Sequence, residues 1–244
     1  MNLLEIQNLS GGYDKVKILH GLSFQIKAGE ILGLIGPNGA GKTTIIKSIL
    51  GILPPMDGEI KMLQYNIKED SLEFKKRIAY IPEVPLLYDE MTLLEHLEFV
   101  AMSHGIHRKV FEERIHKLLE IFRLSNKLHH FPNSFSKGMK QKVMILCAFL
   151  YDPSVYIVDE PFVGLDPKAT KDFIDLIKRK REENKGILMC THVLDTAEKI
   201  CDRFILISSG QIEATGTLEE LREYAGMKEG SLGDIYDRLV RDGE

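Results

Sequence analysis

The sequence has no excess of positive charge. Its 32 lysines and arginines are outnumbered by 36 aspartates and glutamates, which gives 244 residues a formal net charge of −4 and an isoelectric point near 6.1. Proteins that bind nucleic acid usually present a basic surface, so this balance argues against nucleic acid as a partner. Hydrophobic residues at 44% and charged residues at 28% are typical of an ordinary globular protein.

Long hydrophobic runs and a leader segment are also missing. The longest apolar run, VMILCAFLY at 143–151, has nine residues, whereas a membrane-spanning helix needs about 20. The start of the chain, MNLLEIQNLS, has neither the basic segment nor the long apolar core of a signal peptide. We therefore expect any membrane role to depend on a partner protein.

Cysteine is scarce, and the three residues present share no metal-ligand spacing. Cys147, Cys190 and Cys201 each lie in an apolar stretch, which favours buried reduced thiols over disulfides or metal ligands. Because disulfides are rare in reducing compartments, we expect a cytosolic location.

Three continuous apolar runs predict strands that are buried on both faces. They are EILGLIG at 30–36, SVYIVDE at 154–160 and GILMCTH at 186–192, and helical periodicity follows each one. Strands that alternate with helices in this way form a mostly parallel sheet, so the expected fold class is α/β.

Other regions have different patterns. Alternating stretches before residue 30, with glycine turn signals at 11–12 and 29, indicate short antiparallel strands. Helical spacing dominates between 92 and 150, which indicates an inserted helical subdomain. RFILISSGQIEATG at 203–216 has the pattern of a hairpin, and two short amphipathic helices follow it.

The length suits one full-sized domain with smaller parts attached to it. We expect a single domain over residues 1–244. Within it, residues 1–83 and 151–216 would form the α/β core with its β subdomain. Residues 84–150 would form the helical subdomain, and residues 217–244 a short C-terminal helical tail.

GPNGAGKTT at 36–44 is the strongest chemical signal. It fits G-x-x-x-x-G-K-[ST] between a buried strand and a helix, where backbone N–H groups and the helix N-terminus bind phosphate. Lys42 would reach the β- and γ-phosphates, and the Thr43 hydroxyl would bind Mg²⁺. A flexible glycine turn is the alternative, although a chance match is on the order of 1%. The predicted nucleotide-binding residues here are Gly36, Pro37, Asn38, Gly39, Ala40, Gly41, Lys42, Thr43 and Thr44.

Two acids, Asp159 and Glu160, end the run SVYIVDE. Ligands bind at the carboxyl ends of strands in an open α/β sheet. With a phosphate loop in the same chain, Asp159 would hold Mg²⁺ through its water shell, and Glu160 would accept a proton from the attacking water. Taken alone, an acid pair before Pro161 fits a helix-capping turn equally well.

Two further polar residues have two interpretations each. Ser136 opens the helical run SKGMKQK, where it fits either a plain N-cap or an anion-binding helix start. Glu83 lies between two prolines in AYIPEVPLLY, where a lone acid either points into water or faces a metal ion or partner surface.

The phosphate loop, the serine–glycine helix start and the acid pair together resemble the motifs of ATP-binding subunits of ABC transporters. The resemblance spans nearly the whole chain. Tyr13 matches the aromatic residue that stacks on adenine, and FSKGM at 135–139 matches the signature motif. GLDP at 164–167, which contains Asp166, matches the D-loop, and His192 in MCTHVLDTAE matches the switch histidine.

This resemblance implies a P-loop NTPase (RecA-like) core that binds ATP and Mg²⁺ and hydrolyses ATP as a head-to-tail dimer. The second subunit would be another copy of the chain or a paralogous ATPase. Ser136 and Gly138 of one copy would cover the γ-phosphate held by Lys42 of the other. His192 would contact that phosphate and, with Lys42 and Glu160, complete the catalytic group.

The family usually has glutamine at the position of Glu83, as a Mg²⁺ ligand in the loop that meets the membrane partner. A carboxylate keeps the oxygen ligand and adds a charge that a hard cation accepts. The implied partner is a transmembrane permease, and the implied location is the cytoplasmic face of the membrane.

The signature departs from the family pattern at Lys137 and Met139. This form resembles exporter-type subunits paired with ABC-2-like membrane proteins, and it is similar to the Ecs-type subunits of Gram-positive bacteria. One alternative is an ABC ATPase of translation or DNA maintenance, but those resemble tandem cassettes or contain long coiled coils. The other is a nucleotide-binding regulatory module without hydrolysis, which the intact Lys42, Glu160 and His192 disfavour.

Overall fold

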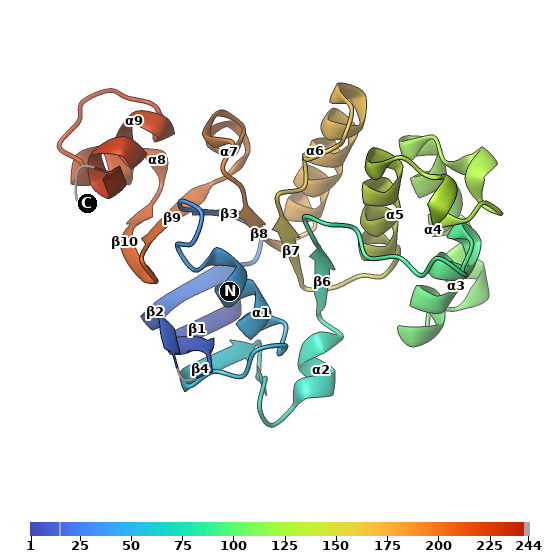
Figure 1. Cartoon of the computed structure of the whole chain (residues 1–244), viewed down its shortest axis with the longest axis horizontal. Coiled ribbons are helices and arrows are strands. Elements are labelled where there is room, and N and C mark those ends of the chain that lie inside the picture. The colour runs from blue at the N-terminus through green and yellow to red at the C-terminus, as the bar shows by residue number, and fades with distance from the viewer. Residues whose placement is uncertain (15, 242–244) are drawn as a thin grey trace.

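The computed structural model describes residues 1–14 and 16–241 (Figure 1). Within those ranges the strands form two sheets. The antiparallel sheet has the order β2 (Val16–Lys27), β1 (Asn2–Tyr13), β4 (Asp57–Met62) and β5 (Tyr65–Asn66). The larger sheet has the order β10 (Gln211–Gly216), β9 (Arg203–Ser208), β3 (Glu30–Ile35), β8 (Gly186–Cys190), β7 (Val155–Asp159) and β6 (Ile78–Ile81).

The larger sheet is parallel except for the β9–β10 hairpin. Every residue of β3, β7 and β8 is buried, which explains why these strands are continuous apolar runs in the sequence. The predicted α/β fold with a mostly parallel sheet and an N-terminal antiparallel part is confirmed.

The helices gather in three places. Beside the sheets lie α1 (Lys42–Ile49), α2 (Ser71–Lys75), α6 (Pro167–Glu182) and α7 (Leu194–Ile200). A helical lobe contains α3 (Leu93–Ser103), α4 (Arg108–Phe122), η1 (Ser125–Lys127), η2 (Pro132–Ser134) and α5 (Lys137–Leu150). At the opposite end of the molecule are α8 (Leu218–Tyr224), α9 (Leu232–Tyr236) and η3 (Asp237–Arg241) (Figure 1).

Buried apolar side chains form three clusters, one for each of these regions. One joins the helical lobe to the parallel sheet and includes Phe122, Phe149 and Tyr156. A second fills the space between the two sheets around α1, and a third lies between the C-terminal helices, α7 and the edge of the parallel sheet. All three clusters include residues of the parallel sheet, which therefore supports each part of the molecule.

The predicted turn at Gly11 and Gly12 is wrong, because both glycines lie inside strand β1. Pairing with β2 shifts register between Leu9 and Gly11 and again between Gly11 and Gly12. A Cβ on Gly12 would lie 1.8 Å from the carbonyl oxygen of Val16, so the glycine permits the close approach of two strands at a bulge.

The three cysteines are free, with Cys190 buried and the other two partly buried. Burial raises the pKa of the Cys147 thiol to about 12 and that of Cys190 well above its usual value. No helix in the described part of the chain combines the length and apolarity that crossing a membrane requires. Of the expected helical tail at 217–244, residues 242–244 lie outside the described residues.

Candidate nucleotide site

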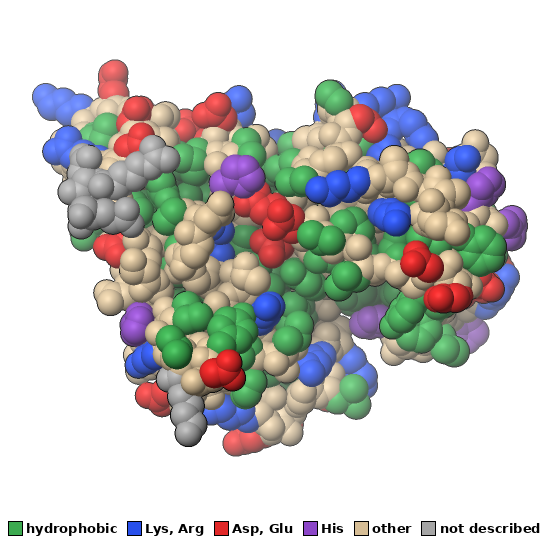
Figure 2. All heavy atoms as spheres, in the orientation of Figure 1, with side chains coloured by type: hydrophobic (Ala, Val, Ile, Leu, Met, Phe, Trp, Pro, Cys, Tyr) green, Lys and Arg blue, Asp and Glu red, His purple; other side chains and the backbone are tan. Residues whose placement is uncertain are grey.

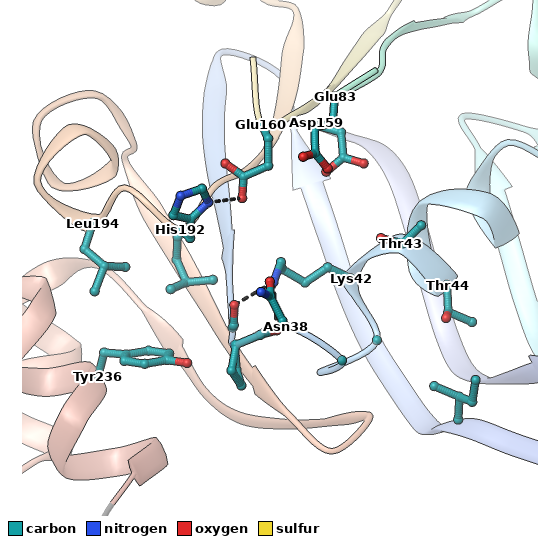
Figure 3. A pocket seen from close by; sticks show the side chains of 16 residues that line it. Asn38, Lys42, Thr43, Thr44, Glu83, Asp159, Glu160, His192, Leu194 and Tyr236 are labelled. Carbon is teal, nitrogen blue, oxygen red and sulfur yellow. Dashed lines mark hydrogen bonds and ion pairs between the residues drawn. The ribbon is translucent and has the colours of Figure 1, made fainter. Parts of the chain in front are cut away.

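A pocket of about 640 Å³ lies where the carboxyl ends of β3, β7 and β8 meet the loop before α1 (Figure 3). Figure 2 shows acidic side chains gathered beside a histidine over these strand ends. The pocket is lined by Ile18, Ile35, Gly36, Pro37, Asn38, Gly39, Gly41, Lys42, Thr43, Thr44, Glu83, Asp159, Glu160, His192, Leu194 and Tyr236.

The loop before α1 is built from glycines for steric reasons. A Cβ on Gly36 would lie 2.4 Å from the carbonyl oxygen of Ile207. Gly41 has a φ of 106°, and a Cβ there would lie 2.8 Å from a methyl carbon of Leu19. Larger side chains would displace the loop, so the glycines allow its backbone to lie along the pocket.

Hydrogen bonds to this loop hold the ammonium group of Lys42 in place. Its Nζ donates hydrogen bonds to the carbonyl oxygens of Gly36, at 2.6 Å, and Pro37, at 2.9 Å. An ammonium group prefers anionic oxygen to carbonyl oxygen, so phosphate oxygens can replace these partners without moving the loop.

Asp159 lies in a negative environment at the end of β7. The residue is 8% exposed. Burial, the carboxylate of Glu160 and the carboxylate of Glu83 raise its pKa from 3.8 to about 6, against the opposing effects of Lys42 and of a hydrogen bond with Tyr80.

Figure 3 shows Glu83 beside Asp159 on the side of the pocket away from Tyr236. The two carboxylates and the Thr43 hydroxyl, which line the same pocket, supply oxygen atoms that suit a divalent cation such as Mg²⁺. When bound, this cation would neutralise phosphate charge. The residues present therefore fit a metal–nucleotide complex.

Glu160 has an unusual backbone for a residue other than glycine, with a φ of 44°. Its N–H donates to the carbonyl oxygen of Cys190 at 2.8 Å, which holds the turn to the neighbouring strand. One carboxylate oxygen accepts from the Thr191 hydroxyl at 3.2 Å, and the other lies 2.8 Å from Nδ1 of His192. Backbone strain of this kind is found where a side chain must be aimed, here into the pocket.

Five predicted site residues do not line this pocket: Tyr13, Ala40, Ser136, Gly138 and Asp166. Tyr13 is 39% exposed, with Nζ of Lys47 5.3 Å from its ring centre. Ala40 is buried behind the loop, where its carbonyl oxygen accepts from the N–H of Gly210 at 3.0 Å.

The other three lie together at the starts of α5 and α6. Ser136 caps α5 by accepting from the N–H of Met139 at 3.3 Å, in agreement with the N-cap interpretation of the sequence. Asp166 caps α6 and also accepts from Nζ of Lys142 at 3.0 Å. A Cβ on Gly138 would lie 2.2 Å from the carbonyl oxygen of Gly164, so the two segments pack tightly against each other.

Sequence reasoning missed Thr191, Tyr80 and Tyr236. The position of Thr191 next to His192, at the end of a buried strand, was a usable signal. Tyr80 lies on β6, next to β7 in the sheet, and sequence alone does not give that pairing. Tyr236 is far from every motif in the chain, so no sequence pattern connects it to the pocket.

A family model described as "ABC transporter" matches residues 19–163, more than half of the chain. The chain therefore belongs to the ABC transporter family. The ATP-binding domains of this family are in general ATPases that use Mg²⁺, form dimers and work with membrane permeases.

The chain is 46% identical over 242 residues to the "ABC-type transporter ATP-binding protein EcsA" of Bacillus subtilis, covering 99% of this chain and 98% of the relative. It is 35% identical over 212 residues to the "SkfA peptide export ATP-binding protein SkfE" of the same organism, covering 87% and 88%. A solved "Structure of ATP binding subunit of ABC transporter" matches with a TM-score of 0.95 and 44% identity, over 98% of this chain and 99% of that chain. The chain is thus an ATP-binding subunit of the ABC transporter type, and its similarity to Ecs-type subunits is confirmed.

Proposed function

We propose that this subunit hydrolyses ATP to drive transport through a separate membrane subunit. The proposal depends most on the carboxylate of Glu160. Thr191 and His192 hold this carboxylate in the pocket that Lys42 also lines. A carboxylate in this position can accept a proton from water that attacks the γ-phosphate. His192 would hold Glu160 and contact the same phosphate.

Thr43, Asp159 and Glu83 would hold Mg²⁺ together with the phosphates. All three line the pocket, and the pKa of Asp159 is raised by burial and by neighbouring carboxylates whose charge a cation would offset. Tyr13 would stack on the adenine ring, since it is an exposed aromatic residue at the end of β1.

The complete site would form between two copies, or with a paralogous ATPase subunit. Ser136, Gly138 and Asp166 lie outside the pocket of their own chain, at the exposed starts of two helices. In a head-to-tail dimer these helix starts would close over the phosphates bound by the other copy.

A groove of about 340 Å³ between core and helical lobe offers a place for the membrane partner. It is lined by Leu50, Tyr80, Val100 and Met144 among others, and Tyr80 also binds the carboxylate of Asp159. A permease segment in this groove would contact the site through Tyr80 and hold the subunit at the cytoplasmic face of the membrane. The similarity to SkfE, which is named for peptide export, supports export as the direction.

Replacing Glu160 with glutamine tests the assignment of the proton acceptor. Glu160→Gln keeps the size of the side chain but is a far weaker base, so we expect ATP turnover to fall by about 100-fold or more. The variant should accumulate as an ATP-bound dimer on size-exclusion chromatography. The matched control is Glu213→Gln, at an exposed position on β10. Turnover of Glu160→Gln at the wild-type rate would contradict the proposal.

A further inference from the structure

The C-terminal tail packs against the helix that follows the switch histidine. Leu232, Ile235 and Tyr236 of the tail share one buried cluster with Ala197 of α7 and Ile35 of β3. Because β3 leads into the phosphate loop and α7 begins just after His192, this cluster lies under two parts of the nucleotide site.

Hydrogen bonds fix the tail in this position. The N–H of Leu232 donates to Oε2 of Glu198 on α7 at 2.6 Å, which joins the start of α9 to α7 directly. Ser231 and Asp234 form a capping box at the start of α9. In addition, Nε of Arg222 on α8 donates to the carbonyl oxygen of Gly230 at 2.8 Å. The tail is therefore attached to α7 by one hydrogen bond as well as by apolar packing, and the other two contacts fix the tail's own shape.

Tyr236 brings the tail into the nucleotide pocket itself. It is 6% exposed, yet it lines the pocket together with Leu194. Figure 3 shows its ring below Leu194, with the hydroxyl directed toward the side of the phosphate loop. Leu194 packs against the same cluster as Tyr236 and follows His192 by two residues.

We propose that Tyr236 is a positioning residue for ATP hydrolysis, which acts on His192 through Leu194. Its ring supports Leu194 from below, and this keeps the segment from Thr191 to Leu194 in the conformation that sets Nδ1 of His192 2.8 Å from Glu160. The His192 side chain itself is 66% exposed and has little packing of its own. This inference rests on the proposed role of Glu160 and His192 in hydrolysis.

The effect of removing the ring follows from packing. Tyr236→Ala leaves a cavity beside Leu194, so the segment that carries His192 gains freedom and its imidazole leaves Glu160 for part of the time. Lys42 and the carbonyl groups that it binds, those of Gly36 and Pro37, are not part of this cluster, so we expect ATP binding to be retained. A positioning role therefore predicts a lower kcat with an unchanged KM.

A double-mutant cycle tests the route through His192. We expect Tyr236→Ala to lower kcat by about tenfold, with KM for ATP within about twofold of wild type. When His192→Ala is already present, Tyr236→Ala should change kcat by less than about twofold, because the residue it positions is gone. Tyr236→Phe should restore at least half of the lost rate, since it keeps the ring. Tyr224→Ala, on α8 of the same tail at 69% exposure, is the matched control.

A second measurement does not depend on turnover. The NMR signal of the His192 imidazole, assigned through its loss in His192→Ala, should shift or broaden in Tyr236→Ala and remain in place in Tyr224→Ala. Additive effects on kcat in the cycle, or an unchanged His192 signal, would overturn the inference. A wild-type chain without turnover would instead overturn the proposed function, and the His192 signal would still decide the role of Tyr236.

Discussion

The surroundings of Asp159 disfavour the ionised form of its carboxyl group, which is the form that would bind a metal ion. Burial favours the neutral carboxyl group, and the carboxylates of Glu160 and Glu83 repel a third negative charge. The native pKa of about 6 lies above the unfolded value of 3.8, so the folded protein holds this proton more tightly than the unfolded chain does. Asp159 therefore stabilises the native state when protonated, and this contribution is lost as pH rises from about 4 to above 6.

Asp159→Asn should accordingly stabilise the nucleotide-free protein at neutral pH. Without the buried charge, the free energy of unfolding at pH 7.5 should rise by on the order of 2 kcal/mol relative to wild type. Below pH 4 both proteins carry a neutral side chain here, so the difference should shrink toward zero. Chemical denaturation in EDTA at both pH values measures it, with the exposed Asp89→Asn as control. Equal free energies of unfolding for the two proteins at pH 7.5 would mean that the negative charge of Asp159 does not destabilise the folded protein.

At the scale of elements, the first turn of α5 and the segment before α6 behave as one unit. Gly138 allows backbone contact with Gly164, and Lys142 of α5 pairs with the capping residue of α6, Asp166. The start of α5 and the segment before α6 therefore pack as one unit, and the absence of a side chain at Gly138 permits their close approach.

Gly138→Ala should separate these two segments. Its Cβ would lie 2.2 Å from the carbonyl oxygen of Gly164, so α5 or the D-loop has to shift. We expect a loss of about 1–3 kcal/mol in unfolding free energy, as for other overpacked sites, together with a fall in ATP turnover of about tenfold or more. Denaturation and steady-state kinetics measure the two effects. Ser134→Ala, at an exposed position just before the signature, provides the control, and wild-type turnover in Gly138→Ala would show that the contact is dispensable.

At the scale of the whole molecule, the predicted site residues of one chain lie in two separate places. Lys42 and Glu160 line the pocket, whereas Ser136 and Gly138 lie outside it. In the proposed head-to-tail dimer the pocket of one copy would meet the start of α5 of the other, and two-fold symmetry would then give two equal sites.

Mixing two inactive variants tests this arrangement. A chain with Lys42→Ala retains its signature, and a chain with Ser136→Ala retains its pocket, so a mixed dimer has one intact site and one doubly defective site. An equal mixture should recover roughly a quarter of the wild-type rate, because half of the dimers are mixed and each has one working site. ATP turnover of the mixture is compared with that of each variant alone. Turnover no higher than the mean of the two variants would rule out a site shared between copies.

The sequence by itself determined those features that depend on neighbours along the chain. The phosphate loop is recognisable because only glycine tolerates the close contacts at positions 36 and 41, and the buried strands are recognisable because both faces are covered. Capping by Ser136 and the acid pair at the end of β7 are local in the same sense. These patterns were sufficient for the α/β fold and for the family.

The tertiary structure alone decided which distant residues share the pocket. It placed Glu83 beside Asp159, Thr191 beside Glu160, and Tyr236 in the lining of the same pocket as Leu194. It also showed that the glycines at 11 and 12 serve a strand bulge, since the partner strand that crowds them had first to be paired. The physical reason is the same in each case: these contacts arise from strand order and helix packing, and no periodicity along the chain records which surfaces will meet.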